Sequence, residues 1–146
     1  MRERHAMTYD TNNVFAKILR GEIPSHKVFE DDDVIAFMDV MPQAPGHTLV
    51  VPKAASRNLL DADPAVLGKL LPIAQKVARA VKEAFAADGV SVFQYNEAAG
   101  GQSVFHLHIH VVPRHEGVTL RRHSDTMEDQ AVLAANAEKV RTALGG

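Results

Sequence analysis

One short stretch, GGQSVFHLHIHVV over residues 100–112, constrains the fold more than any other part of the sequence. Within it, His106, His108 and His110 alternate with apolar side chains. Successive side chains of a β-strand point to opposite faces, so this period of two predicts a strand over 106–112 with the three imidazoles on one face. The apolar face is expected to pack on helices, and the imidazoles are expected to stand together on the more open face.

Local patterns around this strand predict three helices and four further strands. The helices are expected over 11–22, 63–89 and 124–144, and the strands at 28–29, 34–38, 47–51 and 90–95. Asp63 and Pro64 suit the start of the long central helix, Asp88-Gly89 its end, and Pro72 is expected to kink or divide it. The order α-β-β-β-α-β-β-α predicts an α+β domain with a five-stranded, mostly antiparallel sheet.

Length and composition narrow the class of protein. The chain has 146 residues, a net charge of −2 and no cysteine. We expect one domain over 11–146, with a core at 12–113 and a helical extension at 124–144, after a disordered lead-in over 1–10. Disulfides and thiolate metal sites are excluded, and the composition favours a cytoplasmic protein that binds neither nucleic acid nor membranes.

Three alternating histidines allow several roles. A zinc ion would need His106, His108 and a ligand from elsewhere, for which His47 is the candidate, because residues two apart in a strand are about 6.6 Å apart and three from one strand converge poorly. Ordinary surface histidines are the second possibility. The third is a nucleophile, since a neutral imidazole both attacks phosphorus and leaves it readily near neutral pH.

The nucleophile hypothesis explains more of the sequence than the other two. His108 has an imidazole on either side, and a backbone carbonyl of the same strand could hold the proton on its other nitrogen. The loop NEAAGGQS over 96–103 adds Asn96, Gln102 and Ser103 as donors, and its glycines allow backbone N–H groups to turn toward an anion. Gly100-Gly101 could equally serve only as a hairpin turn.

These residues resemble the histidine triad family. The stretch His106-Leu-His108-Ile-His110-Val-Val matches its His-φ-His-φ-His-φ-φ signature, and ILRGEIPSHKVFEDDDVIAFMDVMPQAPGHTLVVPK and NEAAGGQSVFHLHIHVVP extend the likeness over about residues 12–113. The resemblance is closest to the Hint-like branch, the histidine triad nucleotide-binding proteins. It implies a homodimer whose two sheets join, one nucleotide site per subunit, and cleavage of purine nucleoside phosphoramidates at the α-phosphorus without a cofactor.

The resemblance also implies roles for single residues. His108 would be the nucleophile and form a nucleotidyl-histidine intermediate. His110, Ser103 and Asn96 would contact the phosphate or leaving group, His106 would orient His108 through its carbonyl, and His47 would lie close to the triad. Gln102 is a further candidate for nucleotide binding.

The nucleoside pocket implied by the resemblance contains Phe15, Ile18, Phe37 and Val40 around the base. Asp39 would accept hydrogen bonds from the ribose hydroxyls, a task that suits a carboxylate. An apolar slot suits a flat base, but Phe15, Ile18 and Phe37 could instead be ordinary core residues, and Asp39 an ordinary turn residue.

Two departures from the family pattern affect the expected activity. A Cys-x-x-Cys pair that helps to bind structural zinc in many bacterial relatives is replaced by NNVFAK, so we predict no such metal. In eukaryotic Hint proteins a short C-terminal tail with a tryptophan shapes the site, whereas this chain has no tryptophan and is expected to end in a helix. The resemblance therefore does not define which leaving group is preferred. Arg114, His115, Arg121, Arg122 and His123 could reach a polyphosphate. The rival hypotheses are a dinucleoside polyphosphate hydrolase or nucleotidyl transferase of the same mechanism, a nucleotide-binding regulatory protein, and a structural zinc protein.

Overall fold

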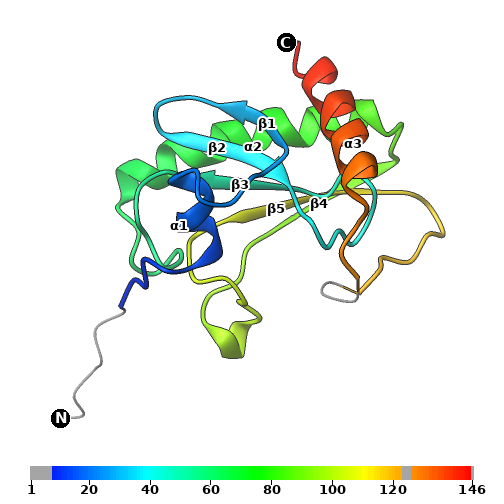
Figure 1. Cartoon of the computed structure of the whole chain (residues 1–146). Coiled ribbons are helices and arrows are strands. Elements are labelled where there is room, and N and C mark those ends of the chain that lie inside the picture. Colours follow the sequence, from blue (N-terminus) through cyan, green and yellow to red (C-terminus); the bar gives the residue numbers. More distant parts are fainter. Residues whose placement is uncertain (1–7, 123–125, 146) are drawn as a thin grey trace.

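A five-stranded sheet lies between α2 on one face and α1 on the other (Figure 1). The computed structural model describes residues 8–122 and 126–145. The elements, in the predicted order, are α1 (Val14–Leu19), β1 (Lys27–Glu30), β2 (Val34–Met38), β3 (Thr48–Pro52), α2 (Pro64–Ala84), β4 (Gly89–Phe93), the 3₁₀ turn η1 (Ala98–Gly100), β5 (Ile109–Arg114) and α3 (Gln130–Ala143).

The strand order is β1-β2-β3-β5-β4, and every neighbouring pair is antiparallel. The α+β class with a five-stranded antiparallel sheet is therefore confirmed. Because β5 inserts between β3 and β4, the strand that carries the end of the histidine stretch lies inside the sheet, and β4 lies at an edge.

Alternation along β2 and β3 divides the buried residues into two cores. Val34, Ala36 and Val50 belong to the large core under α2 and α3, whereas Ile35 and Phe37 belong to the smaller core under α1. Both strands are buried on both faces, so they carry continuous apolar runs. The α1 side of the sheet, which is also the histidine side, is thus covered rather than open.

The central helix begins as predicted and ends earlier. The Asp63 carboxylate accepts a hydrogen bond from the backbone N–H of Ala65, which caps the first turn. Of the two effects expected of Pro72, a kink or a division, the division does not occur, because one helix runs through it. A buried stripe on both sides of Pro72 packs on the sheet and stabilises the helix despite the lost hydrogen bond. The helix ends at Ala84, and Gly89 begins β4 instead of closing the helix.

The strand predicted over 106–112 starts only at Ile109. Before it, the backbone N–H of Leu107 donates to the Ser56 carbonyl, outside the strand ladder. The expectation of an open imidazole face is also wrong. His106, His108 and His110 are 0, 8 and 5% exposed, because α1 and neighbouring loops cover this side of the sheet.

The terminal segments differ from expectation in detail. Helix α3 begins at Gln130, since the Asp129 carboxylate accepts from the N–H groups of Ala131 and Val132; residues 124–125 of the predicted helix lie outside the described residues. Residues 1–7 of the predicted lead-in also lie outside them, and of its remaining residues Tyr9 packs edge-on against His106. Within the described ranges, no helix is long and apolar enough to cross a membrane.

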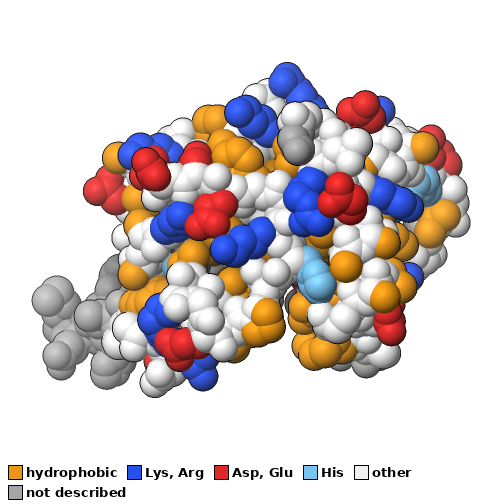
Figure 2. Space-filling view, turned by 45° about the horizontal axis from the view of Figure 1, so that its top comes forward, with side chains coloured by type: hydrophobic (Ala, Val, Ile, Leu, Met, Phe, Trp, Pro, Cys, Tyr) orange, Lys and Arg blue, Asp and Glu red, His pale blue; other side chains and the backbone are white. Residues whose placement is uncertain are grey.

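Lys and Arg side chains alternate with Asp and Glu side chains on the face drawn in Figure 2. Among the described residues of that face, positive charge does not gather into one extended patch. Such a patch is the usual mark of a surface that binds a phosphate backbone.

Candidate active site

The three histidines are held by backbone and side-chain partners that differ for each ring. His108 Nδ1 lies 2.6 Å from the backbone carbonyl oxygen of His106. A carbonyl oxygen only accepts hydrogen bonds, so Nδ1 carries the proton and Nε2 of the neutral ring keeps its lone pair. The Phe15 ring meets the imidazole edge-on, with centroids 4.8 Å apart, and fixes its plane.

His106 is buried and anchors the segment that enters β5. Its Nε2 donates to the Pro52 carbonyl oxygen at 2.7 Å, and its Nδ1 accepts from the Tyr9 hydroxyl. Burial lowers the pKa of His106, only partly opposed by the hydrogen bond to Pro52. Burial therefore favours the neutral ring. The two hydrogen bonds of the ring hold this residue in place, and its backbone carbonyl accepts the hydrogen bond from His108 Nδ1–H.

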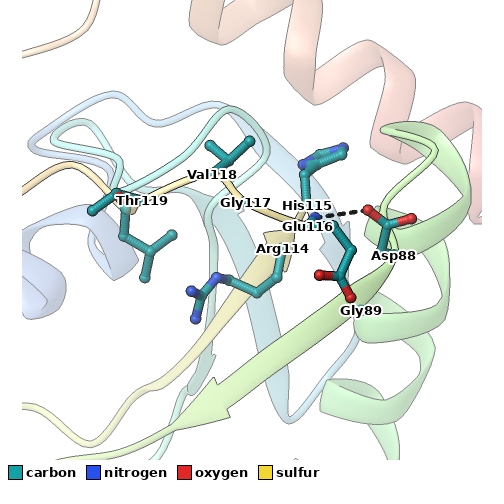
Figure 3. A pocket seen from close by; sticks show the side chains of 9 residues that line it. Asp88, Gly89, Arg114, His115, Glu116, Gly117, Val118 and Thr119 are labelled. Carbon is teal, nitrogen blue, oxygen red and sulfur yellow. Dashed lines mark hydrogen bonds between the residues drawn. The ribbon is translucent and has the colours of Figure 1, made fainter.

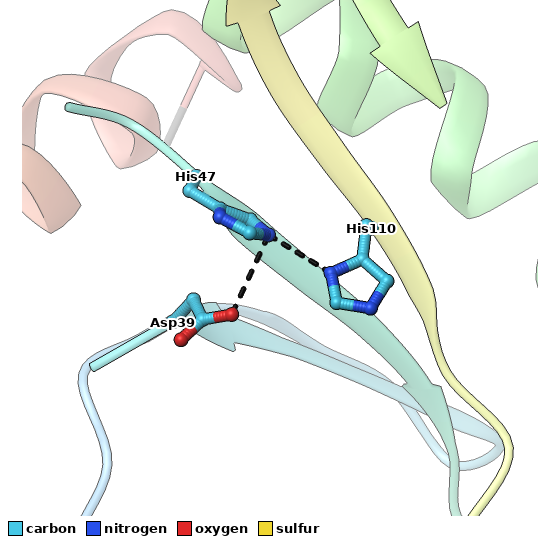
Figure 4. Close-up of side chains that lie close together, drawn as sticks. All are labelled: Asp39, His47 and His110. Carbon is cyan, nitrogen blue, oxygen red and sulfur yellow. Dashed lines mark hydrogen bonds and ion pairs between the residues drawn. The ribbon is translucent and has the colours of Figure 1, made fainter. Parts of the chain in front are cut away.

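A second fixed chain of groups runs from Asp39 through His47 to His110 (Figure 4). The Gln43 backbone N–H donates to His47 Nδ1 at 3.0 Å, so the proton of the neutral ring is on Nε2. That Nε2 lies 2.9 Å from His110 Nδ1 and 3.4 Å from the Asp39 carboxylate. His110 thus accepts at Nδ1 and presents an N–H at Nε2.

Tertiary packing positions this chain of groups. His47 is wholly buried just before β3, and Phe93 of β4 stacks on His110 with centroids 4.5 Å apart and planes 10° apart. The backbone N–H of Asp39 donates to the His47 carbonyl, and its carboxylate accepts from the Met41 N–H. Asp39, His47 and His110 also bring three ligand atoms within 4.8 Å of one another, which is compatible with a metal ion.

An apolar cavity of about 530 Å³ opens beside the triad. It brings together eight of the predicted site residues: Phe15, Ile18, Phe37, Asp39, Val40, Ser103, His108 and His110. Phe15 and Phe37 belong at the same time to the smaller core, so a role in the core and a role in lining the pocket are compatible. This volume is in the range of pockets that bind small molecules.

A second, smaller cavity of about 110 Å³ meets the first at the triad. Ser103, His108 and His110 line both, and Gln43, Phe93, Tyr95 and Gly101 complete the smaller one. The rings of His108 and His110 therefore stand at the junction of a large apolar space and a small aromatic one, whereas His106 lines neither.

Asn96 and Gln102 do not line either cavity. The Asn96 side chain accepts from the Leu59 N–H, and the Gln102 side chain donates to the carbonyls of Arg57 and Val104. Both amides brace the loop that carries Ser103. Sequence reasoning could not separate this bracing role from ligand contact, because either needs an amide in the same loop.

The basic residues considered for a polyphosphate lie elsewhere. Arg114 and His115 line a separate hollow of about 750 Å³ that shares no lining residue with the two cavities at the triad (Figure 3). Arg121 forms an ion pair with Glu128, and Arg122 is exposed and lines neither cavity. His123 lies outside the described residues.

Sequence reasoning missed several residues of these cavities. His26 and Gln130 lie at the large cavity, and Gln43, Phe93 and Tyr95 at the small one. Phe93 and Tyr95 share a face of the strand predicted at 90–95, a period-two signal that could have indicated an aromatic surface. Nothing in the sequence connects His26 with Gln130.

Comparisons with known proteins agree with this geometry. A model of the HIT domain matches residues 20–117. The chain is 57% identical to a Hit-like protein of Bartonella henselae, described as involved in cell-cycle regulation, whose crystal structure holds an unknown ligand; the match covers 93% of this chain and 99% of that one, with a TM-score of 0.88. A histidine triad nucleotide-binding protein of Candida albicans is 29% identical over 92% of this chain and 98% of that one, with a TM-score of 0.68.

An enzyme is among the relatives as well. The adenylylsulfatase HINT3 of Arabidopsis thaliana is 35% identical over 130 residues, which are 85% of this chain and 66% of the plant protein. The span that the HIT domain model matches, residues 20–117, contains the whole histidine triad and all five strands of the sheet. The chain belongs to the HIT domain family.

Proposed function

We propose that this protein is a nucleotidyl hydrolase that cleaves purine nucleoside phosphoramidates at the α-phosphorus through a nucleotidyl-histidine intermediate. One observation carries the proposal. The His106 carbonyl accepts from His108 Nδ1–H, so Nε2 is the unprotonated nitrogen of the neutral ring, and His108 lines both cavities. A protein that only bound nucleotides would have no need of a middle imidazole in this tautomer.

The reaction follows from these groups. His108 Nε2 attacks the α-phosphorus and forms a P–N bond, while the bond from phosphorus to the substrate amine breaks and the amine takes up a proton from solvent. The His110 Nε2–H and the Ser103 hydroxyl donate to phosphoryl oxygens or to the leaving nitrogen as charge develops there. Water then attacks phosphorus, the P–Nε2 bond breaks, and the nucleoside monophosphate leaves.

The nucleoside is assigned to the large cavity. Phe15, Ile18, Phe37 and Val40 suit the faces of a base, and the Asp39 carboxylate suits ribose hydroxyls. The name of the plant relative, adenylylsulfatase, supports chemistry at the phosphorus of an adenylyl group, although with a different leaving group.

The small cavity favours an amine over a polyphosphate as leaving group. Its lining is aromatic and polar, and it includes no Lys or Arg among the described residues. A polyphosphate chain needs cationic partners, and its attached second nucleotide would not fit into about 110 Å³. This supports phosphoramidates over dinucleoside polyphosphates.

The test compares turnover of adenosine 5′-phosphoramidate with that of a diadenosine polyphosphate. Wild type is expected to prefer the phosphoramidate, and His108→Ala is expected to lose more than about a thousandfold in kcat while still binding adenosine monophosphate. His115→Ala is the matched control, since His115 lines neither cavity at the triad. Wild type that binds adenosine monophosphate but turns over neither substrate would contradict the proposal and indicate a binding protein.

We further infer that the protein is a homodimer, as the family resemblance implies, and that it is located in the cytoplasm, as its composition favours. Strand β4 lies at an edge of the sheet, with exposed Val92 on it and exposed Tyr95 just after it. Pairing of two such edges around a two-fold axis would cover these side chains and satisfy the outer backbone groups.

A further inference from the structure

Two segments far apart in the sequence contribute to the lining of the large cavity. His26, just before β1, and Gln130, the first residue of α3, both line it, together with Met127. The His26 Nε2–H lies 2.8 Å from Gln130 Oε1 and donates to it. An imidazole and an exposed amide thus form a polar pair in a mostly apolar lining.

Backbone contacts hold both members of the pair in place. The His26 carbonyl accepts from the Met38 N–H at 3.0 Å, and the Glu128 N–H donates to the Val40 carbonyl at 2.8 Å. Asp129 caps the first turn of α3 and so orients Gln130. The apolar face of α3 packs into the large core, so the C-terminal helix completes the cavity of its own chain.

We propose that Gln130, oriented by His26, reads the hydrogen-bonding edge of the base and selects a 6-aminopurine. This inference rests on the proposed function, which puts the phosphate at the triad and the base in this cavity. An apolar slot does not distinguish one base from another by itself. The carboxylate of Asp39 does not serve this purpose, because the proposed function assigns it to the ribose hydroxyls and a carboxylate only accepts hydrogen bonds.

The chemistry of the amide matches adenine. Gln130 Oε1 uses one lone pair on the His26 N–H, which fixes the orientation of the amide. Its second lone pair can accept from the 6-amino group, while the Nε2 hydrogens can donate to a neighbouring ring nitrogen. A glutamine amide pairs with adenine by this combination of acceptor and donor.

The test compares the affinity for adenosine monophosphate with that for purine riboside 5′-monophosphate, which lacks only the 6-amino group. Calorimetric titration of wild type is expected to show about a tenfold preference for adenosine monophosphate. Gln130→Ala should remove that preference while retaining binding of both ligands. Gln75→Ala, at an exposed position of α2 outside the cavity, should keep it.

A second variant protects the test against an effect on folding. His26→Ala leaves Gln130 present but frees its amide, and should reduce the preference by several fold. Thermal melts of each variant show whether the fold is retained. A tenfold preference that survives in Gln130→Ala and His26→Ala would overturn the inference.

The outcomes distinguish a failure of base reading from a failure of the proposed function. Wild type that shows the base preference, and loses it in Gln130→Ala, but does not hydrolyse a phosphoramidate would support base reading and overturn the proposed activity. Wild type that hydrolyses the phosphoramidate without distinguishing the two monophosphates would overturn base reading alone.

Discussion

His47 shows how one buried side chain can set the hydrogen-bonding direction of another. Its ring receives a hydrogen bond from the Gln43 N–H, and its own Nε2–H lies between His110 and Asp39. The direction of these bonds makes His110 a donor toward the cavity. His47 lies 63 residues before His110 in the sequence, so no pattern within the histidine stretch predicts their contact.

Replacement of His47 by alanine is expected to lower kcat by at least about tenfold. It removes the bond that holds His110 and leaves the Gln43 N–H buried without a partner, which should also cost about 1–3 kcal/mol of unfolding free energy. Kinetics with the adenosine phosphoramidate and urea denaturation measure the two effects. An unchanged kcat beside lowered stability would show that His47 supports the fold and not the reaction.

His106 makes stability depend on pH. Because burial lowers its pKa below the ordinary value of 6.5, the unfolded state binds more protons than the folded state as pH falls through that value. The unfolding free energy should therefore drop as pH falls from 7 toward 5, by at most about 1.4 kcal/mol per pH unit for this one group. Tyr9 and His108 are the titratable groups facing it.

Urea denaturation at a series of pH values measures this dependence. His106→Gln can still donate to the Pro52 carbonyl through its amide, and should show a flatter dependence between pH 7 and 5. A slope equal to that of wild type would mean that the acid sensitivity originates from other groups.

At the scale of elements, the entry into β3 depends on a glycine. Gly46 has φ +95°, and a Cβ there would lie 2.6 Å from the ring of Phe85, at the end of α2. The absence of a side chain allows α2 to approach the residue that precedes His47. Packing between two elements therefore positions a group of the candidate active site.

Gly46→Ala is expected to destabilise the fold by about 3 kcal/mol or more, from backbone strain and from overlap with Phe85. Gly21→Ala is the matched control, because Gly21 has φ +78° but open space around its Cβ position, so only the strain of about 1–2 kcal/mol applies. Urea midpoints of the two variants provide the comparison. Equal losses would show that the contact with Phe85 relaxes freely.

At the scale of the whole molecule, the open edge of β4 sets the expected assembly. Val92 is half exposed there, although its strand neighbour Val111 is fully buried. Val92→Lys should convert the inferred dimer to a monomer, because a charge at a paired edge is costly. Light scattering after size-exclusion chromatography measures the mass. Val132→Lys, at an exposed valine of α3, should leave it unchanged, and a monomeric wild type would refute the dimer.

The sequence by itself determined the parts of this protein that depend on local periodicity and on capping. The apolar run at 34–38, the alternation at 106–112, the Asp63 cap and the apolar stripe of the central helix are properties of neighbouring residues, so the order of the elements and the antiparallel class could be predicted. The histidine spacing likewise predicted a cluster of imidazoles, and the rings of His108 and His110 do meet, with centroids 4.9 Å apart. The role of His108 as nucleophile stays a prediction.

Only the tertiary structure decided which face of that strand is covered and which groups meet there. The partners of the histidines are backbone carbonyls and rings from other elements, such as Pro52 and His47. Asn96 and Gln102 brace a loop because they bind the backbone of Leu59 and Arg57, in the segment after β3. His26 and Gln130 meet across 104 residues. Contacts of this kind depend on how helices and sheet pack, and no local pattern encodes them.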